Sequence, residues 1–215
     1  MDDKTAKLEE VKKNILNTTL PLQDTATNLV FGKGNPEAPI LFIGEAPGKN
    51  EDLEGYPFVG AAGKQLDKLL SLIDLGLDDV YIANILKYRP PKNRNPNVDE
   101  IKAHTPFLIE QIKVIKPAII ATLGNYATKF VLAGFEPDSM KQIEGITNLH
   151  GINKEILIKD EKFVVIPLYH PAAMLYRPQL REVIEKDISK MGDYLDKNHP
   201  SIQRRKKDPQ TQLKF

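Results

Sequence analysis

The chain has 215 residues, of which 41% are hydrophobic and 27% are charged, a composition that suits one globular domain with a substantial buried core. Long-range disorder and fibrous folds are therefore excluded. Thirty Lys and Arg residues against 29 Asp and Glu residues leave a formal net charge of +1, so a polyanionic partner would have to bind a local basic patch.

Cysteine is absent from the sequence, which excludes disulfides, thiolate zinc sites, cysteine-held iron–sulfur clusters and cysteine nucleophiles. No apolar run approaches the roughly 18 to 20 residues that a membrane-spanning helix requires. The N-terminal segment is charged and amphipathic. We therefore expect a cytoplasmic protein with no membrane partner.

The first predicted element is an amphipathic helix within residues 1–16. Leu8, Val11, Ile15 and Leu16 recur at helical spacing among Lys and Glu residues over residues 5–16. This helix should end before Pro21 and pack on the domain that follows.

Four short apolar runs further along the chain predict buried strands, at residues 40–43, 80–83, 118–123 and 163–168. Helical patterns lie between and after them, at about 61–73, 97–115, 124–133 and 178–196. This alternation predicts an α/β fold, a three-layer αβα sandwich with a central, mostly parallel four-stranded sheet. Because no repeat or Ser/Gly-rich linker divides the sequence, we expect one domain over residues 1–198.

The C-terminal residues 199–215 carry the basic run RRKK at 204–207 without an apolar period, so we expect a mobile tail. A run of this kind is either simply solvated or attracts phosphates without sequence preference. The last six residues, QTQLKF, invite comparison with a peptide that binds a sliding clamp. They lack the usual paired aromatic residues, and an unstructured end is the favoured alternative.

Polar residues follow three of the predicted strands at the point where each strand ends: Glu45, Asn84 and His170. Because the carboxyl ends of parallel strands share one edge of a sheet, and ligands bind in the crevice there, we expect these side chains to meet. A carboxylate, an amide and an imidazole form an acid/base set with a bidentate hydrogen-bonding arm. Such a set could recognise the amide edge of a planar heterocycle.

The segment after the first strand adds an aromatic residue and a small-residue loop. Phe58 is either a core residue or a face on which a heterocycle stacks. A P-loop is excluded, because its spacing would need Gly at 58 and Ser or Thr at 65, where the chain has Phe58 and Gln65. The small residues from Gly60 to Gly63 still leave main-chain N–H groups that could meet a phosphate, for example in a DNA backbone.

Three carboxylates at Glu51, Asp52 and Glu54 raise the question of a metal site. Their spacing matches no EF-hand, and a hard cation would need further oxygen ligands. We therefore interpret them as solvated acidic residues and predict no metal site.

The sequence resembles the uracil-DNA glycosylase superfamily, specifically its fourth, iron–sulfur-containing branch, over most of the chain. The resemblance rests on three long motifs in the right order: GEAPG at 44–48 followed by ED at 51–52 and GYPFVGAAG at 55–63; NILKYRPP at 84–91 with NRNP at 93–96; and HPAA at 170–173. It implies that Glu45 positions the attacking water, Phe58 stacks on a flipped base, Asn84 reads the uracil edge and His170 stabilises the departing base.

The resemblance also implies a further set of contacts around that pocket. Ala46 joins the base-binding residues. The expected DNA contacts are Gly60, Gly63, Lys87, Arg89, Arg94, Pro171, Met174 and Leu175. Of these, Met174 and Leu175 resemble the loop that enters the duplex and fills the space left by an extruded base.

One departure from the family is large. Its four cysteines hold a 4Fe–4S cluster, and the aligned positions here are Asn17, Leu20, Tyr88 and His104. With no sulfur ligand, the cluster cannot be built, so we predict an enzyme without a cofactor. Apolar packing by Leu20 and Tyr88 is the expected replacement.

The predicted function is that of a monomeric, nucleoid-associated glycosylase that removes uracil from single- or double-stranded DNA. Two alternatives stay open. The same fold could act on hypoxanthine or xanthine, or it could bind damaged DNA without catalysis.

Overall fold

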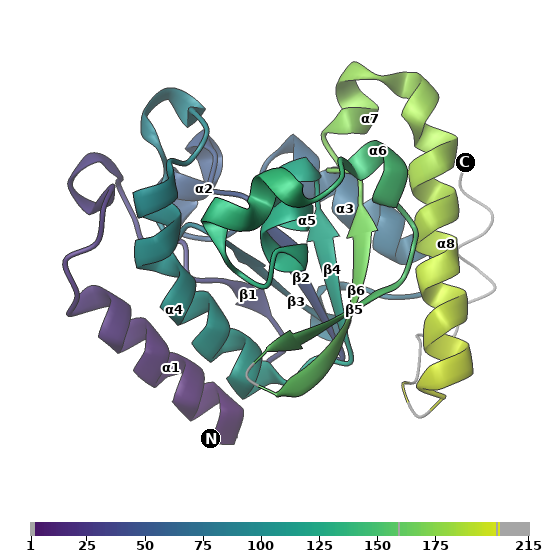
Figure 1. Cartoon of the computed structure of the whole chain (residues 1–215), viewed down its shortest axis with the longest axis horizontal. Helices are drawn as coiled ribbons and strands as arrows, with labels where there is room; N and C mark the ends of the chain where they lie inside the picture. The colour runs from purple at the N-terminus through teal and green to yellow at the C-terminus, as the bar shows by residue number, and fades with distance from the viewer. Residues whose placement is uncertain (1–2, 159, 201, 203–215) are drawn as a thin grey trace.

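A mixed sheet forms the centre of the computed structural model, which describes residues 3–158, 160–200 and 202 (Figure 1). Within these residues the sheet has six strands in the order β1-β3-β2-β4-β6-β5. The four inner strands are β3 (Val80–Asn84), β2 (Ile40–Gly44), β4 (Ile119–Leu123) and β6 (Glu161–Leu168), and they are parallel to one another. They are the four strands predicted from the sequence.

The prediction of four strands in total is wrong, because two antiparallel strands extend the sheet at its edges. β1 (Lys33–Gly34) pairs with β3, and β5 (Lys154–Ile158) pairs with β6. β1 has only two residues, and β5 alternates between partly and fully exposed positions before its buried end. Neither strand has the continuous apolar run that reveals the inner strands.

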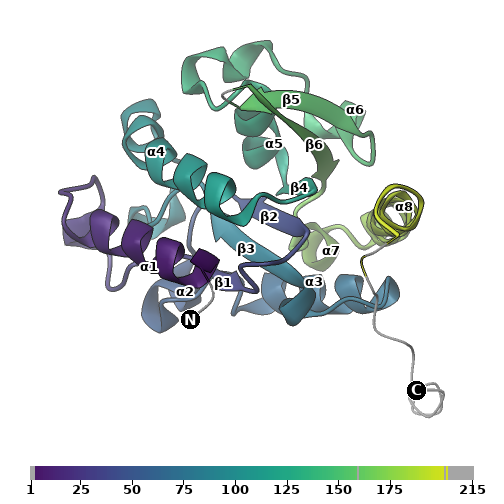
Figure 2. The same cartoon turned by 90° about the horizontal axis from the view of Figure 1, so that it is seen from below.

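Helices cover both faces of the sheet and confirm the αβα sandwich (Figure 2). α1 (Asp3–Leu16), α4 (Val98–Ile115) and α5 (Asn125–Leu132) lie on one face, and α3 (Ala61–Leu72) and α8 (Arg181–Asn198) lie on the other. Shorter helices belong to the connections: α2 (Lys49–Glu54), α6 (Ile146–Leu149) and α7 (Ala173–Tyr176).

Alternation along the inner strands divides the core between the two helical layers. In β2, Leu41 and Ile43 belong to the cluster that includes α1 and α4, whereas Ile40 and Phe42 belong to the cluster that includes α3 and α8. All five residues of β2, β3 and β4 are buried, as expected for parallel strands that are covered on both faces.

The parallel arrangement places the loops that carry the candidate residues at one edge. Gly44 at the end of β2 pairs with Asn84 at the end of β3, and β4 and β6 continue in the same direction. This edge lies at the top of Figure 1, where α2 and α7 also lie.

The predicted tail lies mostly outside the described residues. α8 ends at Asn198, and the basic run at 204–207 and the candidate clamp peptide at 210–215 both fall beyond the described part. In the part of the chain that is described, no helix combines the length and the apolar character needed to cross a bilayer.

Candidate active site

A cavity of about 530 Å³ opens at the carboxyl ends of the parallel strands. Glu45 from the loop after β2, Asn84 from the end of β3 and His170 from the loop after β6 all line it. The structure therefore brings together the three side chains that the sequence placed at the ends of different strands. Ala46, Phe58, Gly60, Arg94 and Leu175, also predicted for this site, line the same cavity.

Asn84 is the most enclosed of these polar side chains, with 2% of its surface exposed. Its Oδ1 lies so close to Gly44 that a Cβ added there would come within 2.3 Å of it. Among the described residues, the amide of Asn84 makes no side-chain hydrogen bond. A buried amide without a hydrogen-bond partner costs free energy unless a ligand bonds to it, so the Asn84 side chain is suited to bind a ligand.

Phe58 forms one wall of the cavity and is also part of the core beneath it. The two interpretations of this residue are therefore compatible. Its ring lies 5.6 Å from that of His170, centroid to centroid, with 30° between the ring planes. A flat aromatic face beside a buried amide is suited to a planar heterocycle.

The main chain of Phe58 is left-handed, with φ at 52°, a conformation that costs free energy for a residue other than glycine. Two neighbours hold it there. Lys33 donates a hydrogen bond from Nζ to the Phe58 carbonyl at 3.0 Å. Gly63 allows the close approach, because a Cβ at that position would lie 1.8 Å from the same oxygen.

The acidic residues after the first motif are structural. Glu51 Oε1 accepts hydrogen bonds from the main-chain N–H groups of Val59 and Gly60, both at 3.2 Å. Asp52 is 4% exposed, and its Oδ1 accepts from the main chain of Thr27 at 2.7 Å. The interpretation as solvated acids is therefore wrong for these two residues, whereas Glu54 is exposed.

Burial shifts the pKa values of Glu45 and His170 in opposite directions. Burial raises the pKa of the Glu45 carboxyl above its ordinary value. Burial lowers the pKa of His170, an effect that the carboxylate of Glu51 partly opposes, so the imidazole is neutral at physiological pH. His170 Nδ1 accepts a hydrogen bond from the Ala172 N–H at 3.2 Å, which leaves the ring proton on Nε2 as a donor.

Burial argues against side-chain contacts with DNA at several of the predicted positions. Lys87 is 0% exposed, and Met174 is 4% exposed and packs in the core with α8. Pro171 is buried in the turn before α7, and Gly63 is buried against the main chain of Phe58. The resemblance assigned these residues by their positions in the motifs, and a motif position does not reveal whether a side chain is buried.

Arg89 is in an intermediate position. Its Nε donates to Asn93 Oδ1 at 2.7 Å, and its Nη1 lies 4.0 Å from Asp52 Oδ2. These contacts direct the side chain toward the protein, with 24% of it exposed. The contacts of Arg89 therefore stabilise the loop between β3 and α4.

Sequence reasoning missed Tyr176, which lines the cavity and is 82% exposed. Leu175 beside it is 42% exposed, whereas Met174 anchors α7 in the core. The exposed pair is thus Leu175 and Tyr176. The sequence did contain a signal for Tyr176, an aromatic residue three positions after the HPAA motif at 170–173.

Lys49, Asn50 and Asn93 also line the cavity and were not predicted from the sequence.

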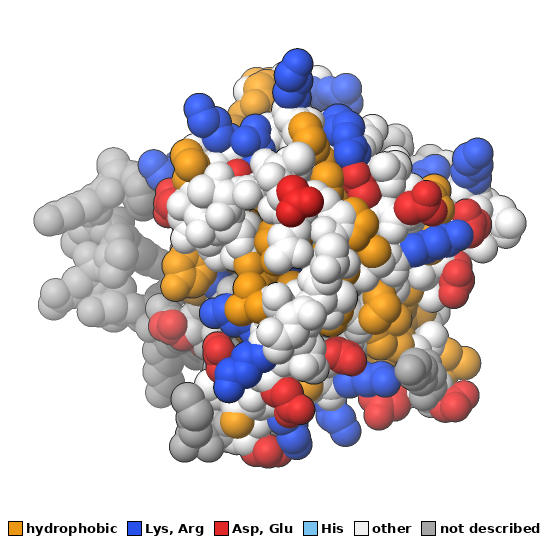
Figure 3. All heavy atoms as spheres, turned by 90° about the vertical axis from the view of Figure 1, so that its left-hand side faces the viewer, with side chains coloured by type: hydrophobic (Ala, Val, Ile, Leu, Met, Phe, Trp, Pro, Cys, Tyr) orange, Lys and Arg blue, Asp and Glu red, His pale blue; other side chains and the backbone are white. Residues whose placement is uncertain are grey.

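Basic side chains gather at the same edge of the molecule. Figure 3 shows Lys and Arg side chains over the upper edge of the face it presents, and acidic and basic side chains mixed lower down. Exposed Lys49 at the start of α2, Lys92 in the 3-10 turn after β3, and Arg94 belong to the segments that follow β2 and β3. The chain has almost no net charge, so this local patch is what could attract a polyanion.

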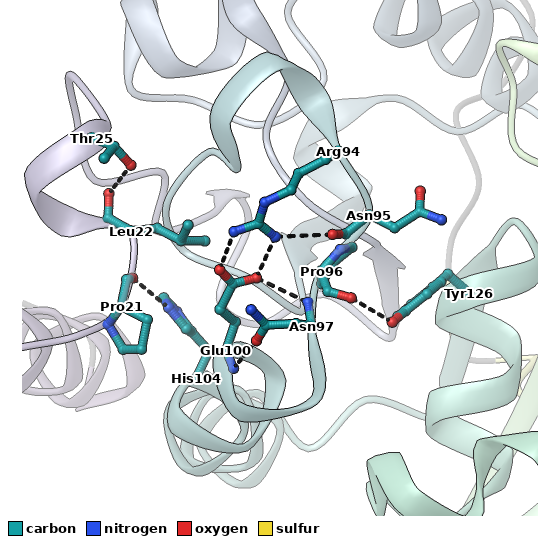
Figure 4. Close-up of polar contacts among 10 residues, drawn as sticks. All are labelled: Pro21, Leu22, Thr25, Arg94, Asn95, Pro96, Asn97, Glu100, His104 and Tyr126. Atoms are coloured by element: carbon teal, nitrogen blue, oxygen red, sulfur yellow. Dashed lines mark hydrogen bonds and ion pairs between the residues drawn. The ribbon is translucent and has the colours of Figure 1, made fainter.

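The loop between β3 and α4 is held by a hydrogen-bonded network (Figure 4). Arg94 binds Glu100 through both guanidinium Nη atoms, and Glu100 forms a capping box with Asn97 at the start of α4. Tyr126 donates from its hydroxyl to the Pro96 carbonyl at 2.9 Å. The network fixes Arg94 at the rim of the cavity.

The four positions aligned with cluster ligands do not fit an iron–sulfur cluster. None carries a thiolate, and Leu20, Tyr88 and His104 are 6%, 4% and 0% exposed, respectively, so side chains fill the region. Asn17 is exposed. Tyr88 packs edge-on against His104, with ring centroids 6.0 Å apart. Within the described residues no group of three or more His, Cys, Asp or Glu side chains could hold a metal ion.

His104 joins two segments by hydrogen bonds at this position. Its Nδ1 accepts from the Lys87 N–H at 3.1 Å. Its Nε2 donates to the Pro21 carbonyl at 3.2 Å, a contact that Figure 4 shows. Burial lowers the pKa of His104 to about 4, with the Pro21 bond opposing the shift. The ring is therefore neutral in the folded protein at neutral pH.

This neutral histidine predicts a loss of stability in acid. Between pH 6.5 and about 4 the unfolded chain binds a proton that folded His104 does not. The free energy of unfolding should therefore fall as the pH drops through this window, by up to about 3 kcal/mol from this group. Urea unfolding of the parent and of His104→Gln across the window measures the effect. A difference in stability that does not change with pH would contradict the assignment.

Comparison with known proteins identifies the family of the chain. Residues 31–191 match the model of the uracil DNA glycosylase superfamily. The chain is 42% identical over 196 residues to a type-4 uracil-DNA glycosylase of Archaeoglobus fulgidus, covering 91% of this chain and 96% of the relative. It is 47% identical to the Saccharolobus solfataricus type-4 uracil-DNA glycosylase over 169 residues, which are 78% of this chain and 76% of that one. The chain belongs to the uracil DNA glycosylase superfamily.

Proposed function

We propose that this protein hydrolyses the N-glycosidic bond of deoxyuridine in DNA, releasing uracil and leaving an abasic site. The observation that carries the proposal is the buried, unpartnered amide of Asn84 in a cavity that also holds Glu45, Phe58 and His170. The type-4 relatives support the same substrate and reaction.

Recognition of the base follows from the groups that line the cavity. Uracil presents an acceptor at O4 and a donor at N3, and one amide can donate to the first and accept from the second. Phe58 supplies the stacking face. Since the target bond is out of reach inside a base stack, the nucleotide has to be flipped into the cavity. Leu175 and Tyr176, exposed at its rim, are placed to fill the gap in the DNA.

Bond cleavage uses the other two polar side chains. Glu45 orients a water molecule and accepts its proton while the oxygen bonds to C1′ of the deoxyribose. The bond between C1′ and N1 breaks, and its electron pair leaves with the uracil. Neutral His170 donates from Nε2 to the anion that develops on the base.

Exchange of the base-reading amide for a carboxylate is expected to weaken uracil recognition. Asn84→Asp replaces the donor with an acceptor and leaves a buried group unpaired, at a cost of roughly 1 to 3 kcal/mol in the transition state. Measurement of kcat/KM on a uracil oligonucleotide tests this. An unchanged value would show that Asn84 does not read the base.

A paired substrate assay separates the alternatives. Oligonucleotides with one uracil or one hypoxanthine are incubated with the protein and then cleaved at abasic sites. Cleavage at uracil supports the proposal, and cleavage at hypoxanthine alone would favour the shifted specificity. Tight binding with no cleavage of either would indicate a non-catalytic DNA-binding protein.

We further propose that the reaction needs no iron–sulfur cluster or other cofactor. The absence of cysteine and the side chains packed at the four aligned positions support this proposal. The groups assigned to recognition and hydrolysis all belong to the cavity at the sheet edge.

DNA is the partner that the family implies, and we propose that the protein acts on it as a monomer near the nucleoid. Binding of the C-terminal peptide at 210–215 to a sliding clamp is a weaker proposal. A pull-down with the cognate clamp, comparing the full chain with one truncated after Asp208, tests it. Equal recovery of the two forms would remove the tail from clamp binding.

A further inference from the structure

Lys87 is a buried basic residue that the proposed reaction does not use. Its side chain is 0% exposed, and it is the one buried Lys or Arg among the residues that the structure describes. Taking an ammonium group out of water is expensive unless hydrogen bonds compensate it. The lysine should therefore do something that an apolar residue of similar length could not.

Two acceptors surround the ammonium group. Lys87 Nζ donates to the main-chain carbonyl of Asn84 at 2.8 Å and to Gln111 Oε1 at 2.6 Å. Gln111 is fully buried on α4, and its Nε2 donates a hydrogen bond to the Phe31 carbonyl at 3.0 Å. A chain of buried hydrogen bonds thus links the end of β3 to α4 and to the segment that leads into β1.

The main chain of Lys87 is fixed from both sides as well. Its N–H donates to His104 Nδ1 at 3.1 Å, and its carbonyl accepts from the Val30 N–H at 2.9 Å. The main chain of Lys87 is therefore held rigidly. A rigid donor can fix the orientation of the carbonyl that it binds.

Asn84 needs such support, because its amide makes no side-chain hydrogen bond within the described protein. The direction of that amide is set by the main chain of Asn84 and by contact with Gly44. The carbonyl that Lys87 holds belongs to the peptide unit that follows the Cα of Asn84. The N–H of the same unit, on Ile85, donates to the Gly44 carbonyl at 3.0 Å, so Lys87 holds the side of the unit that the pairing with β2 leaves open.

We infer that Lys87, together with Gln111, is a positioning residue for base recognition: it holds the main chain of Asn84 so that the amide faces the flipped base. The inference rests on the proposed role of Asn84 in reading uracil. It gives Lys87 a role inside the protein instead of the DNA contact expected from the sequence.

The state of the lysine is compatible with this role over a wide pH range. Burial lowers the pKa of Lys87 to about 7. A neutral amine keeps two N–H donors, and the structure describes two acceptors. The link to Asn84 therefore survives deprotonation.

A double-mutant cycle distinguishes positioning from a general structural role. Lys87→Met keeps the length of the side chain and removes both hydrogen bonds. It is expected to lower kcat/KM on a uracil oligonucleotide by about 10- to 100-fold in the parent, because a small misplacement of a recognition group is costly. In an Asn84→Ala background it should cost less than about 3-fold, because the group it positions is gone.

Two further variants complete the test. Lys68→Met removes an exposed lysine on α3 and should leave kcat/KM unchanged. Gln111→Met leaves Lys87 with one acceptor and should cost about 3- to 10-fold, again only when Asn84 is present. This second variant decides the question if Lys87→Met does not fold. Equal losses in both backgrounds, or no loss in the parent, would overturn the inference.

A measurement that does not depend on excision separates this inference from the proposed function. In nitrogen-15 NMR spectra, the side-chain amide resonances of Asn84 should shift or broaden in Lys87→Met or Gln111→Met and stay in place in Lys68→Met. If the parent releases no uracil, the proposed function fails, and the NMR result alone decides the positioning role. Unchanged Asn84 resonances would overturn it.

Discussion

Glu45→Gln is expected to bind uracil-containing DNA almost as well as the parent and to release uracil about 10² to 10⁴ times more slowly. The exchange keeps the size of the side chain but removes the base that accepts a proton from water. Glu45 lines the cavity with Asn84 and His170, and burial raises the pKa of its carboxyl, which makes it a stronger base.

Single-turnover release of uracil and equilibrium binding to the same oligonucleotide measure the two halves of this prediction. Glu54→Gln is the matched control, because Glu54 is an exposed carboxylate on α2 that does not line the active-site cavity. Equal rates in Glu45→Gln and the parent would remove Glu45 from the mechanism.

Tyr88→Ala is expected to lower the free energy of unfolding by about 3 to 5 kcal/mol. Tyr88 is 4% exposed, shares a core cluster with Leu20 and packs edge-on against His104. Removal of the ring would leave a cavity at the position that the family resemblance assigns to a cluster ligand. Denaturant unfolding of the two proteins at neutral pH measures the loss.

Two companion measurements make the Tyr88 result specific. Tyr176→Ala removes an aromatic ring that is 82% exposed and should change stability by less than about 0.5 kcal/mol. Exhaustive chelation of the parent should leave its thermal midpoint unchanged. A Tyr88→Ala protein as stable as the parent would show that packing has not replaced the cluster.

The inner sheet and the site edge could be predicted from the sequence because their signals are local. The runs that became β2, β3, β4 and β6 are continuous and apolar, and sheet topology then brings Glu45, Asn84 and His170 to one edge. The two edge strands could not be predicted, because β1 has two residues and β5 is largely exposed.

The burial and the hydrogen-bond partners of individual side chains depend on tertiary contacts, which no local sequence pattern encodes. The family resemblance implied that Lys87 contacts DNA, but Gln111, 24 residues along the chain, provides a buried acceptor for its ammonium group. Asp52 was expected to be solvated, but Thr27 and Asn28 bring main-chain donors to it from 25 and 24 residues away. Both contacts join distant segments, so only the folded structure reveals them.

The most direct test of this account is release of uracil by protein whose iron content is measured in the same sample. We expect complete release from an oligonucleotide with one uracil by a colourless protein that contains only traces of iron, with the same rate after chelation. Release that requires iron in a stoichiometric amount, or binding of the oligonucleotide without release by the iron-free protein, would contradict it.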